Sequence, residues 1–302
     1  MVTLTTEPDN ESLELESEAR VGGYAVSKRS RWPKIIAHAI LILSVFVFVS
    51  PFIWAFFTSL KPEAEIFASI YQIIPTEPTF ENYAKVWVEQ PLDRWVMNSL
   101  VISTGIVFFT LLLDTMAGYA LAKGRFRGRS VTFTLVIGTL VIPPQVVLVP
   151  LFIEMNWIGW GNTYWAIMVL FIANPFGTFM MRQFFMTVPD SLIDAARMDG
   201  CNTFQIYTRI MLPMAKPALA SLTVFTFIFA WGAFLWPLII INDGAMFPLQ
   251  VGIALLTGPY TSQWGQLLAA AIMAALPVLT AYLLAQKTFM EGIALSGGGK
   301  GQ

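Results

Sequence analysis

Six stretches of this sequence are apolar over a length that matches a lipid bilayer, and no other feature limits the fold as strongly. About 20 apolar residues are needed to cross a hydrocarbon core about 30 Å thick. The stretches cover 35–57, 95–122, 131–153, 163–181, 218–241 and 265–285. With 56% hydrophobic and 12% charged residues, the chain is too apolar for a soluble domain. The sequence therefore predicts an all-α membrane protein with six transmembrane helices.

The loops between these stretches differ in their basic residues, and the difference orients the chain. Loops rich in lysine and arginine stay in the cytoplasm. The loops at 157–162 and 242–264 contain neither, and the first loop, 61–94, mixes both charges. The second and fourth loops are basic through Lys123, Arg125, Arg127, Arg129, Arg197, Arg209 and Lys216. Both termini and the fourth loop are therefore predicted to be cytoplasmic.

The fourth loop, residues 189–217, is the one long polar segment in the second half of the chain, and we call it the elbow. It predicts two short helices joined by a sharp turn. Ser191 is a favoured N-cap and Asp194 follows three positions later, as in a capping box, so the first helix is predicted to begin at Ser191. Gly200 suits the left-handed residue that ends this helix. Asn202 or Thr203 can cap the second helix.

The residues of the elbow resemble a known motif. D-A-A-R-M-D-G, followed by I-M-L-P-M-A-K-P, resembles the E-A-A-x-x-D-G-A…I-x-L-P-x-x-x-P loop (EAA loop) of ABC-importer permeases. The chain departs from the motif at Asp194, where the family has Glu, and at Cys201, where it has Ala. A-G-Y-A-L-A at 117–122 resembles the end of the second span in the carbohydrate, MalG-type branch, and its small residues also suit close helix contact.

The resemblance implies the transmembrane subunit of an ABC importer for a sugar or related polar solute, in a bacterial or archaeal cell (inner) membrane. It implies as partners a second permease subunit, two ATP-binding subunits or domains and an extracytoplasmic solute-binding protein. ATP and magnesium would be bound by the ATPase and not by this chain. The elbow would be the coupling loop between spans 4 and 5, with Asp194 docking on the ATPase, serving only as a helix cap, or doing both. The residues assigned to ATPase coupling are Asp194, Ala195, Ala196, Asp199, Gly200, Leu212 and Pro213.

Two features inside the predicted spans bear on transport. Prolines recur at 51, 143, 144, 150, 175, 237 and 277, which favours bent or broken helices of the kind that transporters use. Asp114 is an acidic residue well inside the second span, where an ionisable group suggests a functional role such as a proton relay. Thr115 and Tyr119 are alternative hydrogen-bond partners that would satisfy it.

Aromatic residues on the fifth span recur at helical spacing, at Phe227, Trp231 and Phe234. Sugars present apolar C–H faces that stack on aromatic rings, so this stripe is a candidate for the solute path. In the alternative interpretation the same rings face lipid or pack against the partner permease.

The chain lacks the residues for chemistry of its own. A single histidine, His38, and a single cysteine, Cys201, exclude a catalytic triad, an intrachain disulfide and the usual zinc sites, so no catalytic, cofactor or metal site is predicted. A net charge of −1 gives no attraction to nucleic acid.

Residues 1–31 are predicted to be a disordered cytoplasmic tail, 32–295 the six-span domain and 296–302 a flexible tail. The alternative function is a self-contained secondary transporter or channel, which the absence of an internal repeat disfavours.

Overall fold

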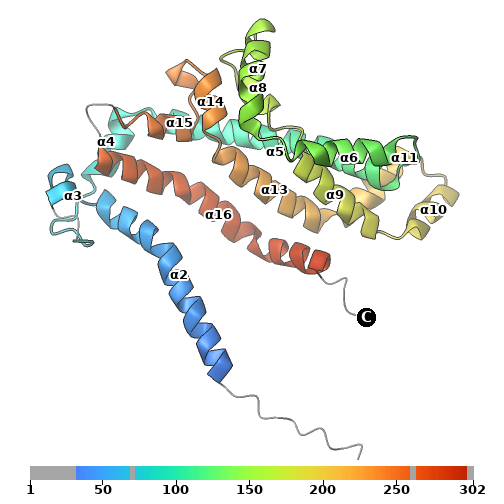
Figure 1. Ribbon diagram of the computed structural model, residues 1–302, viewed down its shortest axis with the longest axis horizontal. Coiled ribbons are helices and arrows are strands. Elements are labelled where there is room, and N and C mark those ends of the chain that lie inside the picture. Colours follow the sequence, from blue (N-terminus) through green and yellow to red (C-terminus); the bar gives the residue numbers. More distant parts are fainter. Residues whose placement is uncertain (1–31, 69–71, 259–262, 298–302) are drawn as a thin grey trace, which may run out of the picture. The chain divides into compact units, whose positions relative to one another are not determined.

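The structure, a computed structural model, describes residues 32–68, 72–258 and 263–297, and its regular elements are helices (Figure 1). The chain divides into two units, residues 1–53 and 54–302, and each is described by itself. The helices are α2 (Trp32–Ser59), α3 (Glu63–Ala68), α4 (Glu81–Glu89), α5 (Leu92–Lys123), α6 (Arg129–Thr139), α7 (Pro144–Trp157), α8 (Tyr164–Val169), α9 (Pro175–Thr187), α10 (Asp190–Met198), α11 (Thr203–Ile206), the π-helix η1 (Tyr207–Met211), α12 (Leu212–Met214), α13 (Lys216–Trp231), α14 (Leu235–Ile240), the 3-10 helix η2 (Gly244–Met246), α15 (Leu249–Ala254) and α16 (Trp264–Gly297).

Both predicted tails fall mostly outside this description. Residues 1–31 and 298–302 are not among the described residues. At the C-terminal end, α16 continues to Gly297, so the first two residues of the expected tail belong to the helix.

Three helices are long and apolar enough to cross a membrane without a break, and they correspond to predicted spans 1, 2 and 6. They cover Ile35–Ser59, Leu92–Lys123 and Trp264–Leu284. Two pairs of consecutive helical segments are long and apolar enough for a span only when each pair is taken together. The first pair is Arg129–Thr139 with Pro144–Trp157, whose axes are bent by 96° at the break, and the second is Thr203–Met214 with Lys216–Trp231, bent by 77°. By length and composition, the described residues therefore hold three to five candidate spans in an all-helical membrane protein.

The predicted spans over 131–153, 163–181 and 218–241 are each broken, as the prolines inside the apolar stretches led us to expect. The chain breaks between α6 and α7, between α8 and α9, and between α13 and α14. Pro144 and Pro175 are the first residues of the helices that follow the first two breaks. Proline suits this position because the backbone N–H that it lacks would have no hydrogen-bond partner within the helix. Prolines 51, 150 and 277 lie inside helices. The expectation of broken helices from the prolines is thus confirmed at two positions.

The break between α8 and α9 is stabilised by polar side chains that replace the lost helical hydrogen bonds. Backbone groups freed at membrane depth need such partners, because lipid offers none. The Thr110 hydroxyl, on α5, donates to the Phe171 carbonyl at 3.3 Å. The Asn174 side chain accepts from the Phe176 N–H at 3.0 Å and so caps α9. These bonds satisfy backbone groups on both sides of the break.

Helices α5, α9, α13 and α16 form the core of the larger unit. Helix α5 packs along α9 and α13, and α13 packs in turn on α16 (Figure 1). Helices α5 and α9 approach closely at Gly118 on α5, where an added Cβ would lie 2.8 Å from the Met181 Cβ and 2.9 Å from the Arg182 backbone nitrogen. The prediction that small residues at 117–122 permit close helix contact is confirmed at this glycine.

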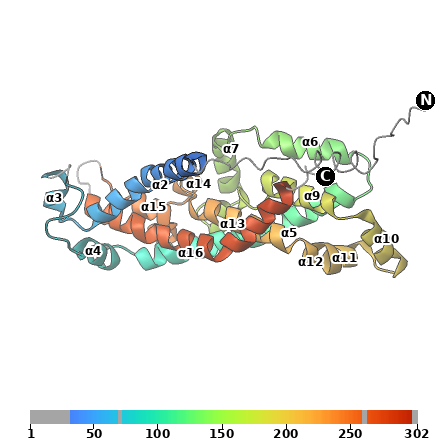
Figure 2. The ribbon, with the colours of Figure 1, turned by 90° about the horizontal axis from the view of Figure 1, so that it is seen from below.

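The larger unit has two ends, with the elbow helices α10, α11 and α12 at one and α3, α4 and α15 at the other (Figure 2). The second end is held by polar side chains. The Glu63 carboxylate accepts hydrogen bonds of 2.9 and 3.0 Å from two backbone N–H groups at the start of α16. The Asn98 amide, near the start of α5, donates to the Ala245 and Phe247 carbonyls at 3.0 and 2.9 Å. Long spans thereby connect two separately organised ends.

Candidate functional site

The first helix of the elbow starts one residue earlier than predicted and without the predicted cap. Helix α10 begins at Asp190 with Pro189 in the N-cap position, and no side chain caps its N-terminus. Ser191 lies inside the first turn. Asp194 forms no capping box and instead lies 3.4 Å from the Arg197 guanidinium, with both side chains exposed. The capping interpretation of Asp194 was therefore wrong.

The start of α10 is tied instead to the C-terminal end of α5. The Lys123 ammonium donates to the Asp190 carboxylate at 2.6 Å and to the Val188 carbonyl at 2.7 Å. This hydrogen bond and the positive charge of Lys123 hold the pKa of Asp190 below its ordinary value, so the carboxylate stays ionised. From the sequence, Lys123 was interpreted only as a positive charge that orients the chain in the membrane. Asp190, in the first turn of α10, was the sequence signal for an ion pair with Lys123.

The turn of the elbow follows its predicted chemistry. Gly200 has φ +81°, the left-handed region that glycine adopts without strain. The space around it is open, so backbone strain and not crowding would oppose a side chain there. The Asn202 side-chain oxygen Oδ1 accepts from the Gln205 backbone N–H, and the Gln205 side-chain oxygen Oε1 accepts from the Asn202 backbone N–H, both at 2.9 Å. The prediction that Asn202 caps the second helix is confirmed, as a reciprocal capping box.

Helix α10 has an inner and an outer face, and the predicted coupling residues divide between them. Ile193 and Ala196 are buried against Phe185 and its neighbours at the ends of α5 and α9. Ala196 is only 6% exposed, so the expectation that it approaches a partner was wrong. Asp194 and Ala195 lie on the exposed side. Met198, 88% exposed, adds an apolar side chain to that side.

The remaining coupling candidates lie around the turn and on the second arm. Asp199 and Gly200 are exposed at the turn, and Pro213 is exposed on α12. Leu212 is half-buried and packs against the core below the elbow. Phe204 on α11, which the sequence did not single out for this role, is 66% exposed. The elbow thus shows an outer surface of acidic, basic and apolar side chains over a packed base.

The predicted aromatic stripe does not form on one helix. Helix α13 ends at Trp231, so Phe234 lies beyond the break and the helical spacing is lost. Trp231 is 2% exposed, its indole N–H donates to the Ala274 carbonyl on α16 at 3.0 Å, and its ring stacks on Phe227. Trp231 is therefore not accessible to a solute in this conformation, which corrects the expectation for that residue. Phe234 is exposed at the break.

Asp114 is buried, and its partner is not one of those expected from the sequence. The Thr178 hydroxyl on α9 donates to one carboxylate oxygen of Asp114 at 2.9 Å. Gly177 on α9 lies directly against the Asp114 carboxylate and must lack a side chain, because a Cβ there would overlap the carboxylate. Thr115 and Tyr119 face elsewhere. Asp114 thus connects α5 to the N-terminal turn of α9.

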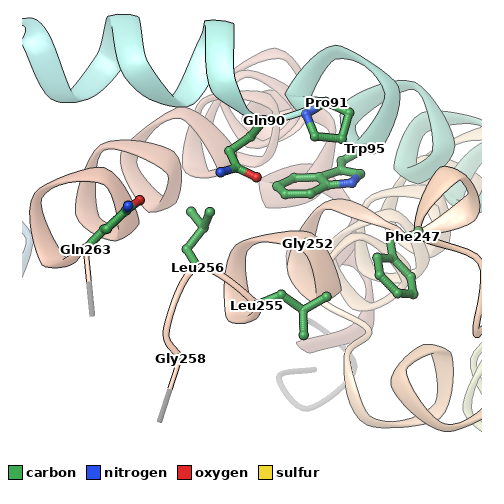
Figure 3. Close-up of a pocket in the computed structure, with 10 residues that line it drawn as sticks. Gln90, Pro91, Trp95, Phe247, Gly252, Leu255, Leu256, Gly258 and Gln263 are labelled. Carbon is green, nitrogen blue, oxygen red and sulfur yellow. The ribbon is translucent and has the colours of Figure 1, made fainter. Parts of the chain in front are cut away.

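A pocket of about 440 Å³ lies at the end of the unit opposite the elbow (Figure 3). Figure 3 shows the Trp95 ring along one wall, with Phe247, Gln90 and Gln263 around it. Gly252 packs directly against the indole, where a Cβ would overlap the ring. No residue predicted for the site lines this pocket, and within the described residues no cluster of three His, Cys, Asp or Glu side chains would hold a metal.

Comparison with known proteins gives a family for this arrangement. Residues 114–287 match the family described as "Binding-protein-dependent transport system inner membrane component". The arabinooligosaccharides transport system permease protein AraQ of Halalkalibacterium halodurans is 36% identical over 255 residues, which are 83% of this chain and 91% of the relative. The sn-glycerol-3-phosphate transport system permease protein UgpE of Escherichia coli O1:K1 / APEC is 31% identical over 270 residues, 87% of this chain and 96% of the relative.

Solved structures show the same fold. A chain of a bacterial ABC transporter involved in the import of the acidic polysaccharide alginate superposes with a TM-score of 0.74 at 27% identity, over 87% of this chain and 98% of the other. A chain of the bacterial alginate transporter in complex with an alginate pentasaccharide-bound periplasmic protein gives a TM-score of 0.63 at 18% identity, over 84% and 94%. The second likeness shows the fold alone.

Proposed function

Because this chain belongs to the family of binding-protein-dependent transport system inner membrane components, and is thus a permease subunit of an ABC importer without catalysis of its own, we propose that its elbow is the surface on which an ATP-hydrolysing subunit docks. Family membership also removes the alternative of a self-contained secondary transporter. ATP and magnesium belong to the partner in this proposal.

One observation supports the docking role above the others, namely the division of α10 into two faces. Ile193 and Ala196 anchor the helix on the ends of α5 and α9, while Asp194, Ala195 and Met198 face outward with no described packing partner in the chain. The outer face therefore offers a protein partner both a carboxylate, on Asp194, and an exposed apolar side chain, on Met198. The helix is stiff, so a force on its outer face reaches the spans below it.

We propose that the chain crosses the inner membrane six times, with both termini and the elbow in the cytoplasm. The loop charges support this orientation. In this proposal each broken span, α6 with α7, α8 with α9 and α13 with α14, makes one crossing. Together with the three continuous helices α2, α5 and α16 they give six crossings.

Topology reporters test this orientation directly. Fusions of a reporter active only outside the cytoplasm should be inactive at Gly128 and Asn202 and active at Gly159 and Gly244. A second reporter active only in the cytoplasm should give the reverse pattern at the same four positions. An extracytoplasmic signal at Asn202 would contradict both the orientation and the docking role.

The solute we propose is a sugar or a related polar solute, delivered by an extracytoplasmic binding protein to this chain and a second permease subunit. The names of the relatives support this class, since they concern arabinooligosaccharides, glycerol 3-phosphate and alginate. Phe234, exposed at the break between α13 and α14, is the aromatic residue we propose for the solute path. Phe227 would act only through its stacking on Trp231.

Co-purification with a transport assay tests the proposal as a whole. The chain is co-expressed with the second permease, the ATPase and the binding protein encoded beside it, and the complex is reconstituted in vesicles. We expect the ATPase to co-purify, and the binding protein loaded with arabino-oligosaccharides to stimulate ATP hydrolysis more than glycerol 3-phosphate does. A permease that purifies intact without any ATPase would contradict the docking role.

A further inference from the structure

The second arm of the elbow contains an irregular helical turn whose first residue contacts α5. Residues Tyr207–Met211 form a π-helix between α11 and α12, and the axis then bends by 77° into α13. A π-turn inserts an extra residue into the helical repeat and is frequently found at functional positions. Here it turns Tyr207 inward, to a position where it is only 6% exposed.

Tyr207 makes two contacts with α5. Its hydroxyl lies 2.6 Å from the Thr115 hydroxyl, and its ring lies 5.4 Å from the Tyr119 ring, centroid to centroid. The Thr115 hydroxyl donates its one proton to the Leu111 carbonyl at 2.6 Å, so Tyr207 is the donor to Thr115. The result is a buried chain of hydrogen bonds from the elbow into the backbone of α5.

Three residues of α5 that contact the elbow lie on one face of that helix. Thr115, Tyr119 and Lys123 are spaced by four residues, which places them in one row along a helix. Lys123 holds the first arm of the elbow through Asp190, and Thr115 and Tyr119 hold the second arm through Tyr207. Asp114 and Gly118 lie on the adjacent face, which packs on α9. The elbow is therefore connected to α5 at both arms and not only to its own spans.

We propose that the Tyr207–Thr115 hydrogen bond is the contact through which movement of the elbow is transmitted to α5, with Tyr207 as a positioning residue for coupled transport. This inference rests on the proposed docking function of the elbow. The π-turn supplies the mobility, because its loosened repeat can shift register while the hydrogen bond and ring contact hold the arm on α5. Loss of the bond leaves docking intact and separates ATP hydrolysis from movement of the span.

Tyr207→Phe tests the transmission role, because phenylalanine keeps the ring contact and removes only the donor. In the reconstituted complex we expect the ATPase to co-purify normally and ATP hydrolysis to stay near its original rate. Uptake should fall, so that ATP consumed per solute imported rises about fivefold or more. Thr115→Val, which keeps the shape and removes the acceptor, should give the same change, and the double variant should be no worse than either single one.

Tyr83→Phe is the matched control. The Tyr83 hydroxyl also forms a side-chain hydrogen bond, 2.7 Å to Ser59, but at the opposite end of the unit. It should leave the ratio of ATP to solute unchanged. An unchanged ratio in Tyr207→Phe, additive losses in the double variant, or failure of Tyr207→Phe to assemble with the ATPase would each overturn the transmission role. A charge reversal at Asp194 that spares ATPase binding would instead remove the docking role itself, so the two failures are distinguishable.

Discussion

Asp194→Lys is expected to abolish solute uptake and stimulated ATP hydrolysis while the permease still folds and inserts. Asp194 is exposed, and its one described ion pair, with Arg197, is 3.4 Å long. An exposed pair at this spacing contributes about 0.5 kcal/mol or less, so its loss cannot unfold the helix. Reversing a charge at a docking surface places like charges together and weakens binding by about tenfold or more. The amount of ATPase that co-purifies with the variant measures the effect.

Two control variants, Asp194→Glu and Glu77→Lys, test whether the effect of Asp194→Lys depends on the charge at this position. Asp194→Glu restores the residue of the family motif and should retain ATPase binding. Glu77→Lys makes the same change of charge at an exposed position before α4, far from the elbow, and should leave ATPase binding unaltered. Full ATPase stimulation in Asp194→Lys would show that the carboxylate has no part in docking, because the cap that was its alternative role does not exist.

Trp231→Ala is expected to destabilise the permease and prevent its assembly, rather than to lower uptake selectively. Trp231 is fully packed, and alanine would leave a cavity between α13 and α16 and remove the indole hydrogen bond to the Ala274 carbonyl. Such truncations cost about 3–5 kcal/mol in packed cores. The packing part of that cost remains in lipid, because van der Waals contact holds transmembrane helices together. Thermal denaturation in detergent, followed by size-exclusion chromatography, measures the loss.

Phe234→Ala separates packing from transport. Phe234 is exposed, so its truncation should leave the denaturation temperature nearly unchanged and lower uptake if the ring contacts the solute. If Trp231→Ala denatured like the original protein and yet transported poorly, Trp231 would belong to the solute path after all, and a conformation that exposes it would have to exist.

The sequence alone determined the features that depend on local chemistry. Apolar length identified the three continuous membrane-length helices α2, α5 and α16, because the bilayer sets that length whatever the neighbours are. Gly200 and Asn202 were placed correctly because a left-handed turn and a capping box involve residues close together in the chain. The elbow motif gave the family for the same reason, since its pattern of small, acidic and proline residues is continuous.

Only the tertiary structure decided which partner each side chain meets. Asp190 is bound by Lys123, 67 residues away, and so α10 starts without the local cap that Ser191 offered. Ala196 faces inward because the ends of α5 and α9 lie beneath it. At the break between α8 and α9 a side chain of another helix satisfies a freed backbone group, as Thr110 does for Phe171. The contact between Tyr207 and Thr115 is of the same kind: a hydrogen bond over 92 residues depends on the packing of whole helices, and no local pattern encodes it.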